Sequence, residues 1–225
     1  MMRPLLVKDG YLPIAGLLAG FGVMGVLFDF FGCPGLSTLF YALAVISSGF
    51  MVYFFRDPER ESSASENEFL SGADGVVRAV EFIREDNYLK AETVRISIFL
   101  NPFNVHVNRT PMAGVVKALN YTPGRHLLTF QNAASEFNEH SSILIENSKT
   151  RCLVKQIVGP IVRRVVYWLS LEQSLARGER IGMMKFGSRM DMYFLKSDVR
   201  VCVKKGDQVR AGLTVVATLT KENGT

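Results

Sequence analysis

The stretch RIGMMKFGSRMDMYF, residues 180–194, holds two strand-like runs separated by the pair Gly187-Ser188. Strand-like alternation resumes directly after Ser188, in RMDMYFL (189–195). A glycine inside a strand pattern weakens the strand, and it usually marks a bulge or a close approach of backbone. We therefore expect two strands here, with an interruption whose glycine and hydroxyl need a chemical explanation.

The sequence from about residue 69 onward contains further short runs of this kind, bounded by Gly, Pro, Asn and Asp. Long amphipathic helical stretches are nearly missing, and SLEQSLARG (170–178) allows at most a short helix. The C-terminal VRVCVKKGDQVRAGLTVVATL (199–219) has the form of a tight hairpin. These patterns predict a mainly β, antiparallel, barrel-sandwich-like domain over residues 61–225.

Residues 1–60 differ from the rest because they include two segments without a single charge, 11–28 and 36–55. At ~1.5 Å per residue, each segment as a helix nearly crosses a hydrocarbon core of about 30 Å. We expect an N-terminal α-helical membrane hairpin, with a re-entrant or interfacial anchor as the alternative. Basic residues flank the hairpin on both sides and place both of its ends in the cytoplasm: Arg3, Lys8, Arg56 and Arg60.

The composition limits the classes of partner. The net charge of +5 comes from basic residues that are scattered along the chain, which suits an anionic membrane surface and argues against nucleic acid. The three cysteines are widely spaced, so we expect neither a disulfide framework nor a metal site.

The Gly-Ser pair allows two kinds of serine chemistry. A hydrolase nucleophile elbow needs a GxSxG turn before a helix, whereas this chain reads FGSRM (186–190) and continues as a strand. Alternatively, the Ser188 hydroxyl attacks the carbonyl of Gly187, which carries no side chain to obstruct it. The amide then becomes an ester, elimination cuts the chain, and hydrolysis of the resulting dehydroalanine leaves a pyruvoyl group as an electron sink.

Several blocks of the sequence resemble, in order, those of the phosphatidylserine decarboxylase proenzymes in their short form. RIGMMKFGSRMDMYF is similar to the family's processing site. The other blocks are YFFRDPER (53–60), FLSGADGVV (69–77), IFLNPFNVHVNRTPMAG (98–114), YTPGRHLLTFQNAASEFNEHS (121–141) and VGPIVRRVVYWL (158–169).

The resemblance implies autocatalytic cleavage between Gly187 and Ser188, giving a β chain of residues 1–187 and an α chain of residues 188–225. Ser188 would become a covalent pyruvoyl cofactor that forms a Schiff base with phosphatidylserine, and decarboxylation would release phosphatidylethanolamine. The two chains would stay together as a heterodimer, with further oligomerisation left open. We expect the enzyme at the cell membrane, with its catalytic domain on the cytoplasmic side.

The family's motifs also suggest roles for individual residues. His106 matches the family histidine and is the expected base for Ser188 and acid for turnover. Asp74, in GADGVV, is expected to orient that base or to hold the processing site. His140 stands where the family more often has arginine, so it is expected to be structural or to bind substrate.

Two departures from the family pattern bear on these roles. Gly72 replaces a usual proline. Arg109 stands where the longer form carries a second histidine, so His106 must serve both steps or recruit another group. Arg109 is instead a candidate for binding the substrate phosphate.

Other functions stay open from the residues alone. A pyruvoyl decarboxylase could act on an ether-lipid serine or on a soluble amino acid. MMKFGS (183–188) also resembles, faintly, the Met-Lys-Met turn of biotinyl and lipoyl carriers, with Lys185 as the modified residue. A membrane protein without chemistry is the remaining alternative.

Overall fold

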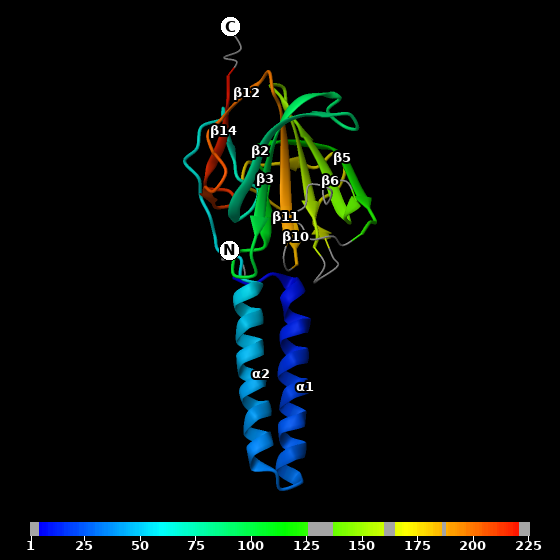
Figure 1. Cartoon of the computed structure of the whole chain (residues 1–225), viewed down its shortest axis with the longest axis vertical. Coiled ribbons are helices and arrows are strands. Elements are labelled where there is room, and N and C mark those ends of the chain that lie inside the picture. The colour runs from blue at the N-terminus through cyan, green and yellow to red at the C-terminus, as the bar shows by residue number, and fades with distance from the viewer. Residues whose placement is uncertain (1–4, 126–136, 160–164, 186–187, 221–225) are drawn as a thin grey trace. The chain divides into compact units, whose positions relative to one another are not determined.

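The structure, a computed structural model, describes residues 5–125, 137–159, 165–185 and 188–220. The chain divides into two compact units, Met1–Glu59 and Arg60–Thr225. The first is helical and the second is built from antiparallel strands (Figure 1). The expected fold class, a mainly β protein with an N-terminal helical hairpin, is confirmed.

The helical unit contains a short 3₁₀ helix, η1 (Lys8–Gly10), followed by α1 (Tyr11–Phe30) and α2 (Pro34–Phe54). The two long helices touch closely where Gly25 of α1 meets the ring of Tyr41, since a Cβ at Gly25 would lie 2.5 Å from that ring. Small residues let helix backbones approach in this way.

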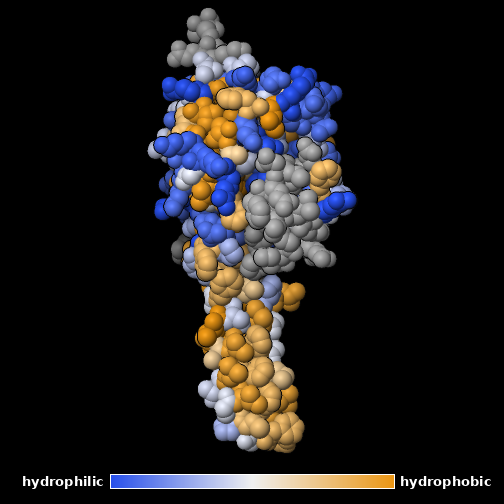
Figure 2. All heavy atoms as spheres, viewed as in Figure 1, coloured by the Kyte–Doolittle hydropathy of each residue, from blue (hydrophilic) through white to orange (hydrophobic). Residues whose placement is uncertain are grey.

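Both long helices are apolar enough to cross a membrane, over Lys8–Phe30 and Pro34–Phe54. Little of either segment is buried, so their apolar side chains form an exposed surface, drawn in orange in Figure 2. An exposed apolar surface of this extent is costly in water and is typical of a lipid-facing element. These helices therefore support membrane association.

The β unit contains three antiparallel sheets in the described part of the chain. Their strand orders are β13-β2-β3-β11-β7-β6-β5-β9, β4-β10-β8 and β1-β14-β12. The strands are β1 Glu68–Leu70, β2 Gly75–Glu85, β3 Ala91–Leu100, β4 Val107–Arg109, β5 Gly114–Thr122, β6 His140–Glu146, β7 Arg151–Ile157, β8 Val165–Tyr167, β9 Ser174–Leu175, β10 Arg180–Met184, β11 Ser188–Leu195, β12 Val199–Val201, β13 Gln208–Val209 and β14 Val215–Leu219.

The large sheet has two faces that differ in chemistry, and β11 lies inside it between β3 and β7. Met190, Met192 and Phe194 alternate along β11 and join the main hydrophobic core. We call this side of the sheet the core face. The intervening Arg189 and Asp191 point to the other side, which we call the polar face.

The sheet β4-β10-β8 covers part of the core face. Ile181 and Met184 of β10 belong to the same core as β11. The Gln156 side chain on β7, directly opposite Met190, donates its Nε2 to the Asn108 Oδ1 of β4, at 2.7 Å. This contact fixes which side of β4 faces the large sheet, and so decides the direction of the side chains around it.

The structure settles one stretch that the sequence left open and differs from the expectation in another. Residues 170–178 form no helix, because Ser174–Leu175 pairs with Gly114–Val115 as an edge strand. The C-terminal stretch is not a tight hairpin either. β12 and β14 do pair with each other, but the chain between them detours to place β13 beside β2.

Candidate functional site

Ser188 is the first residue of β11 and lies directly opposite Leu100, the last residue of β3. It alternates with Met190 and Met192, so its side chain is on the core face. The residue is fully buried, and its Oγ has no hydrogen-bond partner in the described structure. A buried hydroxyl without a partner is costly and asks for a functional explanation. Gly187, the other half of the predicted cleavage site, lies outside the described residues.

Residues 101–106 join the end of β3 to β4, and Ser188 begins β11, the strand that follows β10 along the chain. The backbone N–H of Met184 donates to the carbonyl of His106, at 3.3 Å. Because Ser188 pairs with Leu100 at the end of β3, and residues 101–106 continue from there, His106 and Ser188 lie at the same edge of the β unit.

The His106 ring is fully buried and directed towards the core face. It lies two residues before Asn108, whose side chain meets that face, and side chains two apart in an extended chain share a side. Its Nδ1 lies 2.9 Å from the carbonyl oxygen of Asn104. Because a carbonyl only accepts, Nδ1 carries the proton, and Nε2 keeps its lone pair when the ring is neutral. This is the tautomer that a general base at Nε2 requires.

The loop that carries His106 is held by its own hydrogen bonds. The Asn101 N–H donates to Asn104 Oδ1 at 2.9 Å, and the Phe103 N–H donates to Asn101 Oδ1 at 2.8 Å. These side-chain caps satisfy backbone donors in the turn and fix its path. These bonds define the backbone path that leads to His106.

Asp74 precedes β2 at the same edge of the large sheet, since β2 pairs with β3 beside β11. Its carboxylate receives two hydrogen bonds from the Arg60 guanidinium and one from the Ala211 N–H, at 2.8 Å. In the described structure these are its contacts, and none joins it to His106. The two expected roles of Asp74, orienting the base or holding the processing site, stay predictions, and these contacts support a structural role at this edge.

Arg60 is the partner of Asp74, a role that was not predicted from the sequence. Its charge also fits the flank of a membrane hairpin, where the sequence-based prediction placed it. Its side chain is 7% exposed and that of Asp74 is 11% exposed, so the pair is largely withdrawn from water. Removing one partner of a buried ion pair leaves the other charge without compensation.

We expect Asp74→Asn to lower the free energy of unfolding by about 3 kcal/mol, because Arg60 loses its counterion in a buried place. The matched control is Asp86→Asn, in the exposed pair with Arg84, where a change below about 1 kcal/mol is expected. Chemical denaturation of both variants measures the difference. Equal stability of the two would contradict a structural role for the Asp74–Arg60 bridge.

Gly72, which departs from the family pattern, lies against two methionines of β11. Its N–H points at the Met192 sulfur at 3.3 Å, and a Cβ there would lie 2.5 Å from the Met190 sulfur. Its carbonyl accepts a hydrogen bond from the Arg109 N–H, at 2.9 Å. The glycine therefore leaves room for two bulky sulfurs on the core face.

The Arg109 side chain lies on the side of β4 opposite to His106 and Asn108. Its Nη1 donates to the Gly178 carbonyl at 2.9 Å, and its stem packs on Gly212. These buried contacts tie two loops to β4. Substrate binding by Arg109 stays a prediction, and this geometry supports a structural role instead.

His140 is the first residue of β6, and it is placed on the polar face by its pairing with Ile157 opposite Arg189. Its Nδ1 bonds to the Asn138 carbonyl at 2.7 Å, and burial lowers the pKa of the ring below its usual value. Together with Ser142 and Lys155 it lines a pocket of about 550 Å³. Ser188 and His140 thus point to opposite faces of the sheet, and substrate binding by His140 stays a prediction.

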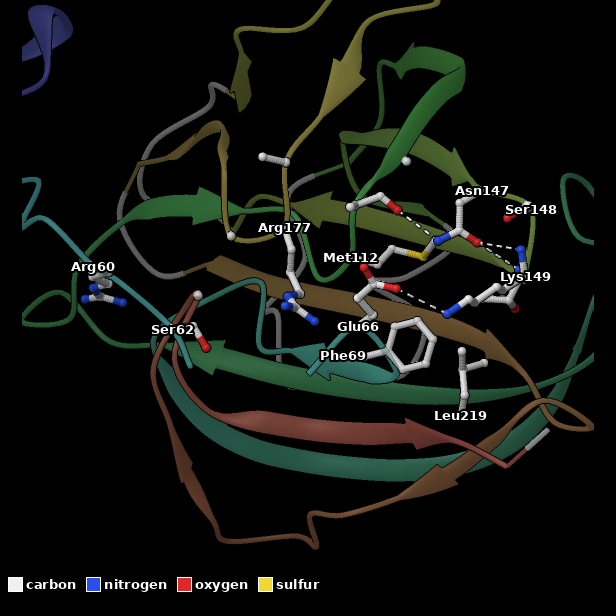
Figure 3. Close-up of a pocket in the computed structure, with 16 residues that line it drawn as sticks. Arg60, Ser62, Glu66, Phe69, Met112, Asn147, Ser148, Lys149, Arg177 and Leu219 are labelled. Carbon is white, nitrogen blue, oxygen red and sulfur yellow. Dashed lines mark hydrogen bonds and ion pairs between the residues drawn. The ribbon is translucent and has the colours of Figure 1, made fainter. Parts of the chain in front are cut away.

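A second pocket, of about 560 Å³, opens elsewhere on the β unit (Figure 3). It includes Arg60, Phe69, Lys149 and Arg177, but neither Ser188 nor His106 lines it. The charged side chains that line this pocket already have hydrogen-bond or ion-pair partners. Arg177 donates to backbone carbonyls of residues 64 and 65, and Lys149 lies 3.5 Å from Glu66. It is therefore separate from the serine–histidine site.

The fold and the site define a mainly β protein with apolar N-terminal helices and a buried serine near a buried histidine. The sequence profile described as phosphatidylserine decarboxylase matches residues 48–217. The chain belongs to the phosphatidylserine decarboxylase family, which confirms the resemblance that the motifs carried.

Full-length relatives agree with this assignment, and each is named phosphatidylserine decarboxylase proenzyme. The relative from Carboxydothermus hydrogenoformans is 40% identical over 222 residues, which cover 97% of this chain and 99% of the relative. The one from Syntrophotalea carbinolica is 42% identical over 212 residues, or 94% and 95% of the two chains. The one from Salinibacter ruber is 43% identical over 188 residues, or 81% and 82%.

Proposed function

We propose that this protein decarboxylates phosphatidylserine to phosphatidylethanolamine through a pyruvoyl group made from its own Ser188. The observation that carries the proposal is the buried Ser188 hydroxyl without a hydrogen-bond partner, at the same edge as the His106 ring. The relatives' shared name supports both the substrate and the synthesis of the protein as a precursor.

The cleavage needs a base and a later proton acceptor. Oγ of Ser188 attacks the carbonyl carbon of residue 187 and gives its proton to Nε2 of His106. The bond from that carbon to the Ser188 nitrogen then breaks, and the nitrogen takes up a proton. Loss of the Ser188 Cα proton expels the new carboxylate of residue 187, which leaves dehydroalanine. Tautomerisation and addition of water release ammonia and leave the pyruvoyl group.

A pyruvoyl group fits this site. The proposed cleavage removes Oγ from residue 188, and this is the atom that has no hydrogen-bond partner in the described structure. A pyruvoyl group here supplies the carbonyl that binds the substrate amine and accepts electrons as carbon dioxide leaves. His106 holds a proton at Nε2 once its ring is charged, and it can return that proton to the substrate Cα. The hydrophobic core around Met190 and Leu100 keeps water from the reacting carbon.

The two chains of the cleaved enzyme would remain associated through the sheet. The α chain would begin with β11, which pairs with β3 along its whole length and with β7 from Arg189 to Phe194. The proposed assembly is a heterodimer of residues 1–187 and 188–225. Its apolar helices would anchor it in the cell membrane, with the β domain on the cytoplasmic side.

Intact-mass analysis of the purified protein tests the proposal. We expect two fragments divided after residue 187, and the smaller should have a blocked N-terminus that reacts with hydroxylamine. Phosphatidylserine, its ether-linked analogue, free serine and aspartate are then assayed in parallel, and carbon dioxide should come from serine lipids. An active protein that remains one uncut chain would remove the basis of the proposal, and release from a free amino acid alone would change the substrate class.

A further inference from the structure

Three fully buried polar side chains form a hydrogen-bonded line across the core face. Ser141 on β6 donates its hydroxyl to Gln156 Oε1 on β7, at 2.7 Å. Gln156 donates Nε2 to the Oδ1 of Asn108 on β4, also at 2.7 Å. All three residues have no exposed surface. Their spacing in the sequence gives no hint of the line, because it depends on the register of β6 with β7 and on the sheet that covers them.

The line has a defined orientation at each amide. In the structure the Ser141 hydroxyl donates to the oxygen of Gln156, the Gln156 nitrogen faces Asn108, and Asn108 accepts from it with its own oxygen. Gly182 of β10 provides the space, since a Cβ there would lie 3.1 Å from the Gln156 nitrogen and 2.3 Å from the Val166 carbonyl. The line uses the Oδ1 atom of Asn108, so the Nδ2 group is the end of this amide that takes no part in it.

Asn108 Nδ2 is buried and has no acceptor in the described structure. Ser188 Oγ, on the same face, also lacks a hydrogen-bond partner in the described structure. The position of Asn108 relative to Ser188 follows from the pairing of the strands. Asn108 meets Gln156 opposite Met190, one side-chain repeat along β11 from Ser188. His106 lies two residues before Asn108, in the direction of that serine.

We propose that Asn108 is a further catalytic residue, whose Nδ2–H donates to the carbonyl oxygen that replaces the Ser188 nitrogen after cleavage. The inference rests on the proposed function. A donor placed at this oxygen makes the carbonyl carbon more electrophilic towards the substrate amine, and it is effective because the site is dry. Gln156 and Ser141 are positioning residues that keep the donor end of the amide turned inward.

Asn108→Asp tests the donor with almost no change of shape. An aspartate keeps an oxygen for Gln156 but has no N–H, so the ionised form cannot donate. We expect normal self-cleavage, because the carbonyl forms only afterwards. In the cleaved variant, hydroxylamine trapping and kcat should both fall by about 100-fold at neutral pH, with KM little changed. Both should recover as the pH is lowered, since a protonated carboxyl donates again.

The controls separate this role from a structural one. Asn147→Asp makes the same change at an exposed turn and should match the wild type. Asn108→Ser removes the donor at every pH, so its trapping should stay slow at low pH. Gln156→Glu should slow trapping by a smaller factor, because it no longer donates to Asn108. Far-UV circular dichroism checks the fold of each variant.

Two results would overturn the inference. One is wild-type trapping by folded, cleaved Asn108→Asp, and the other is an uncut Asn108→Asp chain, which would place Asn108 in processing. A wild-type protein that is itself uncut and untrapped would instead count against the proposed function. The two failures are therefore distinguishable in one set of samples.

Discussion

Ser188→Ala should leave the polypeptide uncut and without detectable release of carbon dioxide from phosphatidylserine. Without Oγ no ester can form at residue 188, and without cleavage there is no carbonyl to bind the substrate amine. The variant should nevertheless fold. The lost hydroxyl has no partner in the described structure, so its removal should not lower the free energy of unfolding. Intact mass, a decarboxylation assay and thermal unfolding measure the three effects.

Ser142→Ala is the matched control for this variant. Ser142 is also buried and its Oγ also lacks a partner in the described structure, but it lies opposite Lys155 on the polar face. Loss of a buried serine hydroxyl is thus the same in both variants, and only the face of the sheet differs. We expect Ser142→Ala to be cleaved as fast as the wild type. Cleavage of Ser188→Ala after residue 187 would show that the bond is broken by another group.

His106→Gln should slow self-cleavage and reduce kcat of any cleaved enzyme by about 1,000-fold. A positioned acid or base contributes roughly 10²- to 10⁴-fold, and Arg109, the family's second histidine position, points away from the site. The time course of cleavage by mass and the steady-state rate of decarboxylation report on the two steps separately. A cleaved variant with low kcat would confine His106 to turnover.

His140→Gln offers a close comparison, because the two histidines share a local geometry. Each ring places Nδ1 near the carbonyl of an asparagine two residues earlier. His140, however, is on the polar face. We expect its variant to cleave normally, with any change confined to KM if His140 binds substrate. Equal loss of cleavage in both variants would argue that the effect comes from the shared loop geometry and not from a base at His106.

The parts of the fold that depend on local pattern could be predicted from the sequence. Uncharged runs indicated the two helices, and alternation along RMDMYFL (189–195) indicated β11, because each signal lies in consecutive residues. For residues 170–178 the sequence allowed at most a short helix, and the structure has an edge strand there instead. The pairing of Ser174–Leu175 with β5 overrides helix propensity there, and no local pattern contains that information.

The site could be predicted only in part, for the same reason. Ser188 and His106 were identifiable from motifs, and the pairing of Ser188 with the end of β3 explains why both lie at one edge. The bridge between Asp74 and Arg60 and the line from Ser141 to Asn108 depend on which strands lie side by side. Sequence spacing does not report on that register. Arg60 in particular has a charge that suits two roles, and only its burial distinguishes them.

The position of β11 inside the large sheet has a consequence for how such an enzyme is made. β11 pairs with β3 on one side and with β7 on the other, so it can form both sets of hydrogen bonds only while the sheet is assembling. If the enzyme cleaves itself as proposed, folding would therefore precede scission, and one continuous polypeptide would supply both products. Each molecule would then carry a prosthetic group that it builds once and cannot exchange, so damage to that group would end its working life.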